Sequence, residues 1–458
     1  MSRSRRPAAA FLLLAATIGT ALALALPAFG GYDEPVHFLR AWQVADGTVF
    51  GTQGTTADGV HDFGGDVPAE LVADIRVLLV EGMFSPGRAQ DTWDHLGDDA
   101  PGGPREFVGF SGAAVYSPVP YLPSAVAIRA GRVFGASTLL LLFLARFASL
   151  GAFVALVLLA FRRFPGRAWT LAALAVLPVV VFQAASVSAD TVTIALVLLV
   201  LAYAARFTVG SEPISRGALA ECAAAVVALA LAKQPYWLFA LALTVPALRR
   251  REIRLVVGAT LAGAAVVAAA WSAWAADRHV PQDFAPAYID EGNYAYRDVD
   301  PDEQLTHVRE RPWEFAAVVV RTFAHDGTTI TRDAVTQTAW WRVPWWATLG
   351  LALTLVALAF GDAQPSLGRA SSVAIGLLAV AVLLVSVLLG YAGWNAVEAP
   401  RVDAFQGRYL FPVAAAALLA VPSRWARRSL VDSTGGYVVA ACALVDLAVV
   451  AGIVRMFY

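Results

Sequence analysis

Charged residues are scarce in this chain. Only 15% of its 458 residues are charged, 58% are hydrophobic, and the mean hydropathy is +0.62. A soluble protein of this length needs a larger charged surface, so the composition excludes soluble folding. We therefore expect an all-α polytopic integral membrane protein.

Cysteine and lysine are also nearly absent. The two cysteines, Cys222 and Cys442, lie in apolar segments, which is typical of small buried residues and not of a disulfide or metal pair. The one lysine is Lys233, among many arginines. The net charge of −1 offers no basic surface to nucleic acid, so we expect no nucleic-acid partner.

Long apolar runs are abundant instead. The first covers residues 9–29 and follows Arg3, Arg5 and Arg6. This start resembles a signal peptide, but the run has the length of a span and more helices follow. We expect about eleven transmembrane helices, within a range of ten to thirteen. The ten later segments lie at about 137–160, 168–187, 191–207, 216–232, 235–249, 255–276, 344–360, 372–392, 409–421 and 435–455.

Arginine-rich connections predict the orientation. Residues 162–167, 249–254 and 424–428 each contain several arginines, and the positive-inside rule favours the cytoplasmic side for them and for the N-terminus. All three connections lie on the cytoplasmic side if residues 117–133 do not cross the membrane. If these residues cross, all three connections move outside unless a later span is also miscounted. We therefore expect 117–133 to be a juxtamembrane or half-inserted helix, in a protein of the cytoplasmic (inner) membrane.

The whole chain, residues 1–458, is expected to form a single membrane domain. Residues 30–136 would form a long extracytoplasmic loop with juxtamembrane helices, one of them at about 68–80. Residues 277–343 would form a second large extracytoplasmic loop, between the transmembrane helices of 137–276 and those of 344–458. On this topology the polar candidates described below meet on the outer face.

The stretch at residues 30–42 opens the first outer loop. Asp33 is a natural N-cap and Pro35 is tolerated in a first helical turn, so a helix should begin here. Helical spacing places Phe38 and Trp42 on one face and His37 on the other, together with the neighbouring acidic residue at 34. This pattern predicts a helix in the membrane interface, with its acidic face in water.

Asp33 and Glu34 are the candidate catalytic residues. A carboxylate at this position can act as general base for an acceptor hydroxyl, or bind a divalent ion through its oxygens. The alternative is a helix cap with a favourable anion at the helix N-terminus.

Further polar groups on the same side are candidates for binding a lipid phosphate. Asp190 lies between two apolar segments, and an ionised carboxylate at the bilayer centre costs roughly 2.5–3.5 kcal/mol, so it should lie at the outer rim or face a wet cavity. Lys233 can bind a phosphate as a point charge, and Arg408 can bind one through two parallel hydrogen bonds. The alternatives are a cap for Asp190, snorkelling for Lys233, and an ordinary membrane-rim residue for Arg408. The candidate binding residues are His37, Asp190, Lys233, Gln406, Arg408 and Tyr409.

Charges within the predicted spans form a separate group. Arg146, Glu221 and Asp446 are functional candidates by default, because ionisable groups in lipid are costly. Pairing between helices is the alternative.

Five ordered motifs carry a family resemblance. They are Asp33-Glu34-x-x-His37, Tyr116-x-Pro118-x-x-Tyr121-x-Pro123, Gln183-x-x-Ser186-x-x-x-Asp190, Lys233-x-Pro235-Tyr236 and Gln406-Gly407-Arg408-Tyr409-x-x-Pro412. In this order they resemble a bacterial family of predicted membrane proteins known as domain of unknown function 2142. That family resembles in turn the GT-C class of integral-membrane glycosyltransferases, which use polyprenyl-phosphate-linked sugars.

The resemblance implies roles for single residues. Asp33 would deprotonate or orient the acceptor, and Asp190 would match the acidic position of the second outer loop. Lys233 and Arg408 would lie near the lipid phosphate. The chain departs from the class in having no D-x-D at Asp190, which puts a metal in doubt, and no sizeable soluble domain after the spans.

We therefore expect a GT-C-like glycosyltransferase that moves a hexosyl or pentosyl group on the outer face of the membrane in cell-envelope glycan assembly. Its partners would be a polyprenyl-phosphate-linked sugar donor, an envelope glycan or lipid-linked acceptor, and membrane lipid. No metal ligands are predicted, and a divalent cation is left open as a cofactor. The alternatives are a lipid-linked glycan translocase or transporter, in which Arg146 and Asp446 matter most, or a membrane protein without catalysis.

Overall fold

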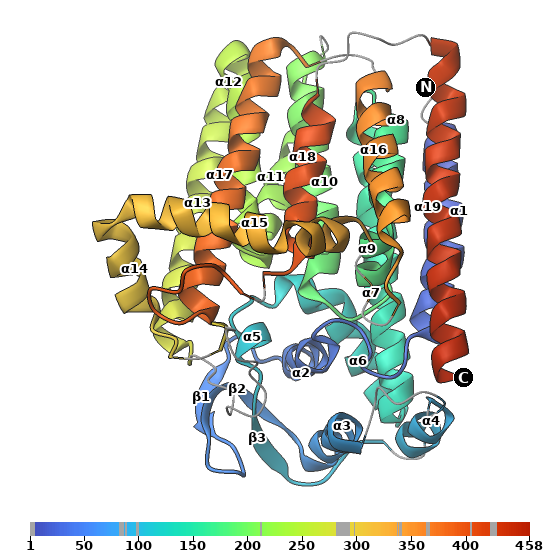
Figure 1. Ribbon diagram of the computed structural model, residues 1–458, viewed down its shortest axis with the longest axis vertical. Helices are drawn as coiled ribbons and strands as arrows, with labels where there is room; N and C mark the ends of the chain where they lie inside the picture. The colour runs from blue at the N-terminus through green and yellow to red at the C-terminus, as the bar shows by residue number, and fades with distance from the viewer. Residues whose placement is uncertain are drawn as a thin grey trace.

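The computed structural model shows a helical bundle with a smaller layer folded against one end (Figure 1). It describes residues 5–81, 87, 89–97, 100–210, 213–280, 294–296, 298–336, 338, 341–362, 367–403, 405–421 and 428–458. Most of the predicted arginine-rich connection at 424–428 lies outside these residues.

Long apolar helices form the bundle. Among the described residues, six helices are long and apolar enough to cross a membrane: α1 (Arg5–Ala25), α7 (Thr138–Arg163), α10 (Ala189–Val209), α13 (Arg251–Arg278), α17 (Arg369–Trp394) and the Ser433–Phe457 part of α19 (Arg428–Phe457). Shorter elements fill the bundle: α8 (Ala168–Ala175), α9 (Pro178–Ala184), α11 (Arg216–Ala232), η2 (Tyr236–Leu243), α12 (Thr244–Arg249), α16 (Trp345–Gly361), η4 (Gly407–Leu410) and α18 (Phe411–Ala420). Each expected apolar segment is thus largely helical, which supports a multi-pass membrane protein, while the number eleven stays a prediction.

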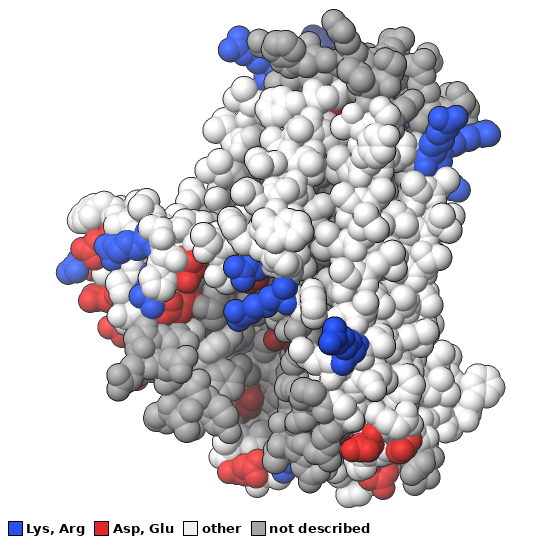
Figure 2. Space-filling view, turned by 45° about the vertical axis from the view of Figure 1, so that its right-hand side comes forward, with Lys and Arg blue, Asp and Glu red and all other residues white. Residues whose placement is uncertain are grey.

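The outer surface of the bundle is apolar. Leu255 of α13 is 86% exposed and Leu377 of α17 is 67% exposed, which is unfavourable in water and favourable in lipid. Figure 2 shows a broad, largely uncharged band on this surface, with Lys and Arg at its top end and again along its lower edge, and with Asp and Glu only from this lower edge downward.

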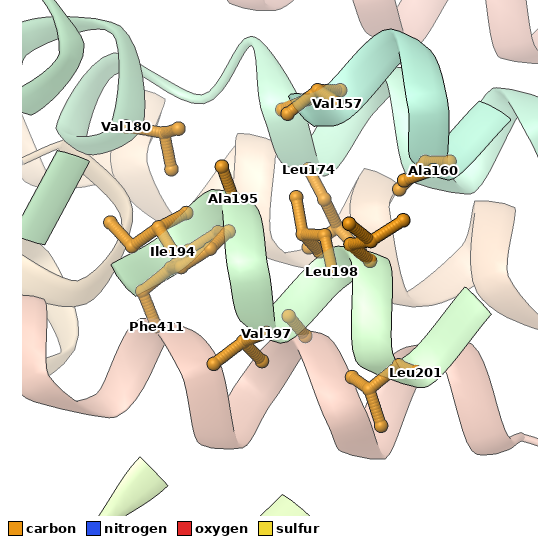
Figure 3. Packing of buried hydrophobic residues seen from close by; sticks show 14 of the residues in the cluster. Val157, Ala160, Leu174, Val180, Ile194, Ala195, Val197, Leu198, Leu201 and Phe411 are labelled. Carbon is orange, nitrogen blue, oxygen red and sulfur yellow. The ribbon is translucent and has the colours of Figure 1, made fainter. Parts of the chain in front are cut away.

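Helix α10 is the centre of the bundle. It is apolar on all sides, and a helix of this kind is stable only when other helices surround it. Helix α10 contacts α7, α9, α11, α18 and η2, and its Ile194, Leu198 and Leu201 belong to one buried cluster with Leu174 and Phe411 (Figure 3). Because α10 is held so firmly, Asp190 in its first turn has a well-defined position.

The first loop forms a compact layer at one end of the bundle (Figure 1). A three-stranded antiparallel sheet has the order β1 (Thr52–Thr55), β2 (His61–Pro68), β3 (Arg105–Gly109), with Thr52 opposite Gly64 and Gly64 opposite Gly109. The helices of the layer are α2 (Glu34–Ala45), α3 (Ala69–Glu81), α4 (Ala89–Gly97), α5 (Ser111–Ala114), η1 (Val119–Tyr121) and α6 (Leu122–Val133). The helix expected at 68–80 is confirmed as α3, whereas the all-α expectation missed the sheet.

Helix α6 corresponds to the segment at 117–133. Its 12 residues are too short to cross a bilayer of about 30 Å alone, and it packs on α2 and α7. This agrees with a juxtamembrane or half-inserted helix.

The second loop contains two helices, α14 (Pro301–Glu310) and α15 (Pro312–Thr336). Figure 1 shows α15 crossing the bundle roughly at right angles to the long helices. Trp313 and Val320 are exposed on α15, whereas Val318 and Ile330 are buried. An amphipathic helix in this orientation is typical of a membrane interface.

Candidate functional site

The turn before α2 brings the chain close to the end of α9. A Cβ on Gly31 would lie 2.7 Å from Cβ of Ser186, so only glycine fits there without a shift. Asp33 takes the N-cap position with φ of 55°, in the left-handed region, and its side chain makes no capping hydrogen bond. The predicted helix start is confirmed, but the capping role is wrong, because the Asp33 carboxylate contacts Arg408 instead.

Helix α2 does not have the exposed polar face that the sequence predicted. Nine of its 12 residues are buried, including Glu34, His37, Phe38 and Trp42 on both predicted faces. Phe38 and Trp42 belong to a hydrophobic cluster that also contains Phe63 and Val67 of β2, and this cluster covers one side of the helix. Helices α6 and η1 cover another side. The expectation of a solvated acidic face is therefore wrong, because α7 and the segment after α9 cover Glu34, and Tyr121 of η1 contacts His37.

Glu34 is held by a buried network. Its carboxylate accepts hydrogen bonds from Arg146 Nε at 2.8 Å and Nη2 at 2.6 Å, and from the backbone N–H groups of Gly31 and Val187, each at 2.9 Å. Both partners of the ion pair are fully buried. These contacts occupy both carboxylate oxygens, which favours a structural role over the catalytic role predicted for Glu34.

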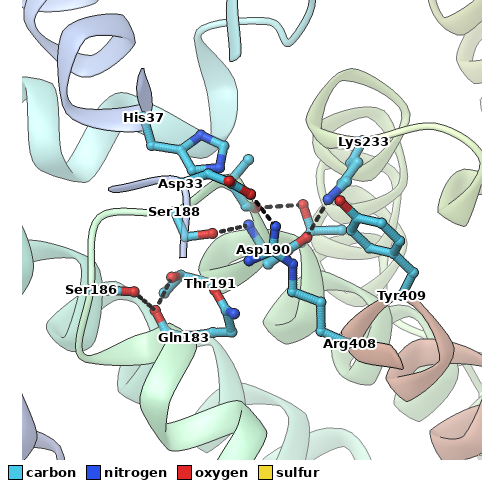
Figure 4. A network of polar contacts seen from close by, with 12 residues as sticks. Asp33, His37, Gln183, Ser186, Ser188, Asp190, Thr191, Lys233, Arg408 and Tyr409 are labelled. Carbon is cyan, nitrogen blue, oxygen red and sulfur yellow. Dashed lines mark hydrogen bonds and ion pairs between the residues drawn. The ribbon is translucent and has the colours of Figure 1, made fainter. Parts of the chain in front are cut away.

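Four ionic side chains from distant segments, Asp33 among them, form one cluster (Figure 4). Arg408 Nη2 donates to Asp33 Oδ2, and Arg408 Nε lies 3.3 Å from Asp190 Oδ2. Lys233 Nζ donates to Asp190 Oδ1 at 2.6 Å. The chain therefore brings together the turn before α2, the start of α10, the end of α11 and the start of η4.

Asp33 is the accessible member of this ionic cluster. Its side chain is 47% exposed, whereas those of Arg408 and Asp190 are 2% and 7% exposed and Lys233 is buried as well. Ser188 Oγ accepts from the backbone N–H of Asp190 at 3.1 Å and so fixes the first turn of α10. A reacting molecule would meet the Asp33 carboxylate first.

The charges of the cluster affect the two titrating groups in the first loop. Burial is the largest single influence on the Asp33 carboxyl and raises its pKa, but the charges of Arg408, His37 and Lys233 and the hydrogen bond from Arg408 together outweigh it, so the pKa lies below its ordinary value. Burial lowers the pKa of His37 to about 4. His37 is therefore neutral at pH 7, and its Nδ1 shares a hydrogen bond of 2.7 Å with the hydroxyl of Tyr121.

Aromatic rings line the cationic side chains. Lys233 Nζ lies 4.4 Å from the centroid of the Tyr409 ring and 5.3 Å from that of Tyr116, and Arg408 Cζ lies 5.2 Å from that of Tyr32. Cation–π contacts of this kind stabilise charges away from water. The carbonyl of Tyr409 accepts from the hydroxyl of Tyr236 at 3.0 Å, which ties η4 to η2.

Glycine permits the position of Arg408. A Cβ on Gly407 would lie 2.1 Å from the carbonyl oxygen of Ile330 and 2.6 Å from the backbone nitrogen of Ala334. Only glycine therefore lets η4 approach the backbone of α15 so closely. Gln406, just before η4, has a buried Oε1 without a hydrogen-bond partner among the described residues.

Gln183 is the functional candidate for which the sequence predicted no role. It is fully buried, and neither its amide nitrogen nor its amide oxygen has a hydrogen-bond partner within the described part of the chain. In the view of Figure 4 its amide extends from α9 toward the side of Asp190 and Arg408. The motif Gln183-x-x-Ser186-x-x-x-Asp190 was the available signal, but it gave no reason to single out the amide.

The cluster does not suit a divalent cation. Asp33 Oδ2 contacts Arg408, and the two oxygens of Asp190 face Lys233 and Arg408, whose charges would repel a metal ion. Among the residues that the structure describes, no group of three or more His, Cys, Asp or Glu side chains could hold a metal ion.

The comparison with known proteins gives one match. The model of a family described as a predicted membrane protein, DUF2142, matches residues 16–417. No curated protein and no solved structure matches the chain.

Proposed function

We propose that this chain, which belongs to the DUF2142 family of predicted membrane proteins, is a glycosyltransferase that uses a polyprenyl-phosphate-linked sugar. One observation carries the proposal: the half-exposed carboxylate of Asp33 is joined through Arg408 to the buried pair of Asp190 and Lys233. An accessible base beside buried cations suits the transfer of a group from a phosphate.

The chemistry is a displacement at the anomeric carbon of the donor sugar. The acceptor hydroxyl oxygen forms the new bond to this carbon as its proton passes to Asp33. The bond between the carbon and the phosphate oxygen breaks, and its electron pair stays on the phosphate. Arg408 and Lys233 stabilise the charge that develops there. The products are the glycosylated acceptor, the polyprenyl phosphate and the proton on Asp33.

Gln183 is proposed to bind the donor sugar. A buried amide that lacks partners costs free energy, and sugar hydroxyls can both donate to it and accept from it. Arg408 and Lys233, which would bind the phosphate, and Gln183, which would bind the sugar, then lie around the first turn of α10.

The position of α15 supports a lipid-linked substrate. Gly407 contacts the backbone of α15, so the site adjoins this helix, and the exposed Trp313 and Val320 provide an apolar surface on it. A polyprenyl chain in the membrane could thus extend from a phosphate held at Arg408. We propose that this face is the outer face of the cytoplasmic membrane, with the N-terminus in the cytoplasm.

Transport of a lipid-linked glycan is the second candidate. Asp446 of α19 is buried within a candidate span, and neither carboxylate oxygen has a hydrogen-bond partner among the described residues. Ionisable groups in such places often mark transport paths. Arg146 supports this alternative less, because backbone carbonyls and Glu34 satisfy its guanidinium.

A complementation experiment tests the two candidates. A strain without the gene is complemented with wild type, Asp33→Asn, Asp46→Asn or Asp446→Asn at equal membrane levels, and mass spectrometry measures surface glycans and lipid-linked sugars. Asp46 is a matched control because it also pairs with arginines in the first loop, Arg105 and Arg132, away from the site.

We expect Asp33→Asn alone to lose one glycan residue while its lipid-linked donor accumulates. Normal glycans with Asp33→Asn and a defect with Asp446→Asn would instead favour transport. Normal glycans in all three variants would contradict both candidates.

A further inference from the structure

We propose that the phosphate of the donor replaces Asp33 at Arg408, and that binding of the donor thereby releases the carboxylate that takes the acceptor proton. This inference rests on the proposed function and concerns the order of events at the same site. It starts from the fact that Arg408 is shared between two carboxylates, Asp33 at Nη2 and Asp190 at Nε.

The two carboxylates differ in their freedom to leave. Asp190 lies in the first turn of the central helix, is 7% exposed, and is held by Lys233 at 2.6 Å. Asp33 lies in a turn, is 47% exposed, and has no side-chain hydrogen bond to the helix that it precedes. A ligand that competes for Arg408 would therefore displace Asp33 and leave Asp190 in place.

The balance of charge favours such a displacement. Asp33, Asp190, Lys233 and Arg408 carry two negative and two positive charges, and the neighbouring His37 is neutral at pH 7. A phosphate added to the intact cluster would leave a buried negative charge unpaired, which is costly. The balance of charge is restored when the Asp33 side chain rotates out into the solvent, because the phosphate then replaces the Asp33 carboxylate at the guanidinium of Arg408.

The exchange also suits the chemistry. A carboxylate paired with arginine is a weak base. It becomes a stronger base when the arginine pairs with another anion instead. Asp33 stays at the N-terminus of α2 in both positions, and the helix dipole stabilises the freed negative charge. The base would thus become fully available only when a donor is present, which would reduce unproductive reactions.

Binding of farnesyl phosphate, with farnesol as the uncharged probe, tests the exchange on the full chain in lipid nanodiscs. Asp33→Asn removes the competing charge, so we expect it to bind farnesyl phosphate roughly tenfold more tightly than wild type, with unchanged binding of farnesol. Asp46→Asn should match wild type for both probes. Inorganic phosphate should compete with farnesyl phosphate if the phosphate group alone is recognised.

A measurement on the wild-type chain avoids any dependence on variants. Carbodiimide labelling of carboxylates, read by mass spectrometry, should increase at Asp33 when farnesyl phosphate is added and stay constant at Asp46. Unchanged or weaker binding by Asp33→Asn, or protection of Asp33 by farnesyl phosphate, would overturn the exchange and leave the proposed function intact. If neither wild type nor Asp33→Asn binds farnesyl phosphate more tightly than farnesol, both the exchange and the lipid-phosphate donor are wrong.

Discussion

Arg146 of α7 and Glu34 of α2, 112 residues apart in the sequence, form an ion pair without any exposed side-chain surface. The other guanidinium contacts of Arg146 are hydrogen bonds to the carbonyls of Ala23, Leu26 and Pro27 at the end of α1, at 2.8 to 3.0 Å. One arginine therefore joins the end of the first helix to the start of the turn that carries Asp33. These contacts fix the turn that carries Asp33 against α1 and α7.

Arg146→Gln should destabilise the protein strongly. It leaves Glu34 buried without its cation and three carbonyls without their donor, which typically costs about 3–5 kcal/mol. Thermal unfolding of the purified protein in detergent measures the effect. Arg163→Gln is the control, because the pair of Arg163 with Glu221 is partly exposed and contributes about 1 kcal/mol or less. Equal unfolding temperatures for the two variants would contradict the structural role of Arg146.

Gln183→Met should separate binding from stability. The buried amide has no hydrogen-bond partner among the described residues, so methionine of similar length should leave the unfolding temperature unchanged or raise it. Transfer should fall at least tenfold, mainly through a higher KM for the donor. The matched control is Gln43→Met, since Gln43 donates to the carbonyl of Gly64 at 3.1 Å and accepts from Arg40. That variant should lose about 1–3 kcal/mol of stability. A loss of stability in Gln183→Met without an effect on KM would show that the amide is structural.

The stability of the protein should depend on His37 in acid. Burial lowers the pKa of His37 from 6.5 to about 4, so between these values the unfolded chain binds a proton that the folded chain does not. This contribution to stability is complete above pH 6.5, is lost as the pH falls toward 4, and amounts to about 3 kcal/mol at most.

Denaturant unfolding at several pH values, compared between wild type and His37→Gln, measures this contribution. The free energy of unfolding of His37→Gln should change less than that of wild type between pH 6.5 and 4. His325→Gln should show the wild-type profile, because the His325 side chain is exposed. An identical profile for His37→Gln would mean that His37 does not resist protonation.

Gly407→Ala should impair the site through the backbone. The added Cβ would lie 2.1 Å from the carbonyl oxygen of Ile330, so η4 must move and carry Arg408 away from Asp33. We expect a lower unfolding temperature and at least a tenfold loss of transfer. Gly376→Ala is the control, because the added Cβ would point into open space beside α17. This variant should keep full activity and gain up to about 1 kcal/mol in the free energy of unfolding. Full activity of Gly407→Ala would show that the contact with α15 does not position Arg408.

The sequence alone determined the membrane class and the approximate positions of the helices. The length and hydropathy of an apolar run are local properties, so the segments at 137–160 and 372–392 could be recognised without their neighbours and correspond to α7 and α17. The sheet was missed because β1 has only 4 residues and both β1 and β2 contain glycine and polar residues. Pairing with strands from elsewhere in the loop stabilises them.

The sequence also suggested that Asp33, Asp190, Lys233 and Arg408 would meet, because counting the spans put them on one side of the membrane. Only the tertiary structure decided how they pair and which of them stays accessible. Asp33 and Glu34 are neighbours with the same chemistry, yet α7 and the end of α9 enclose Glu34, while Asp33 faces outward to Arg408, 375 residues away. Exposure and charge pairing depend on what the rest of the chain packs against a residue, and short-range sequence patterns do not contain that information.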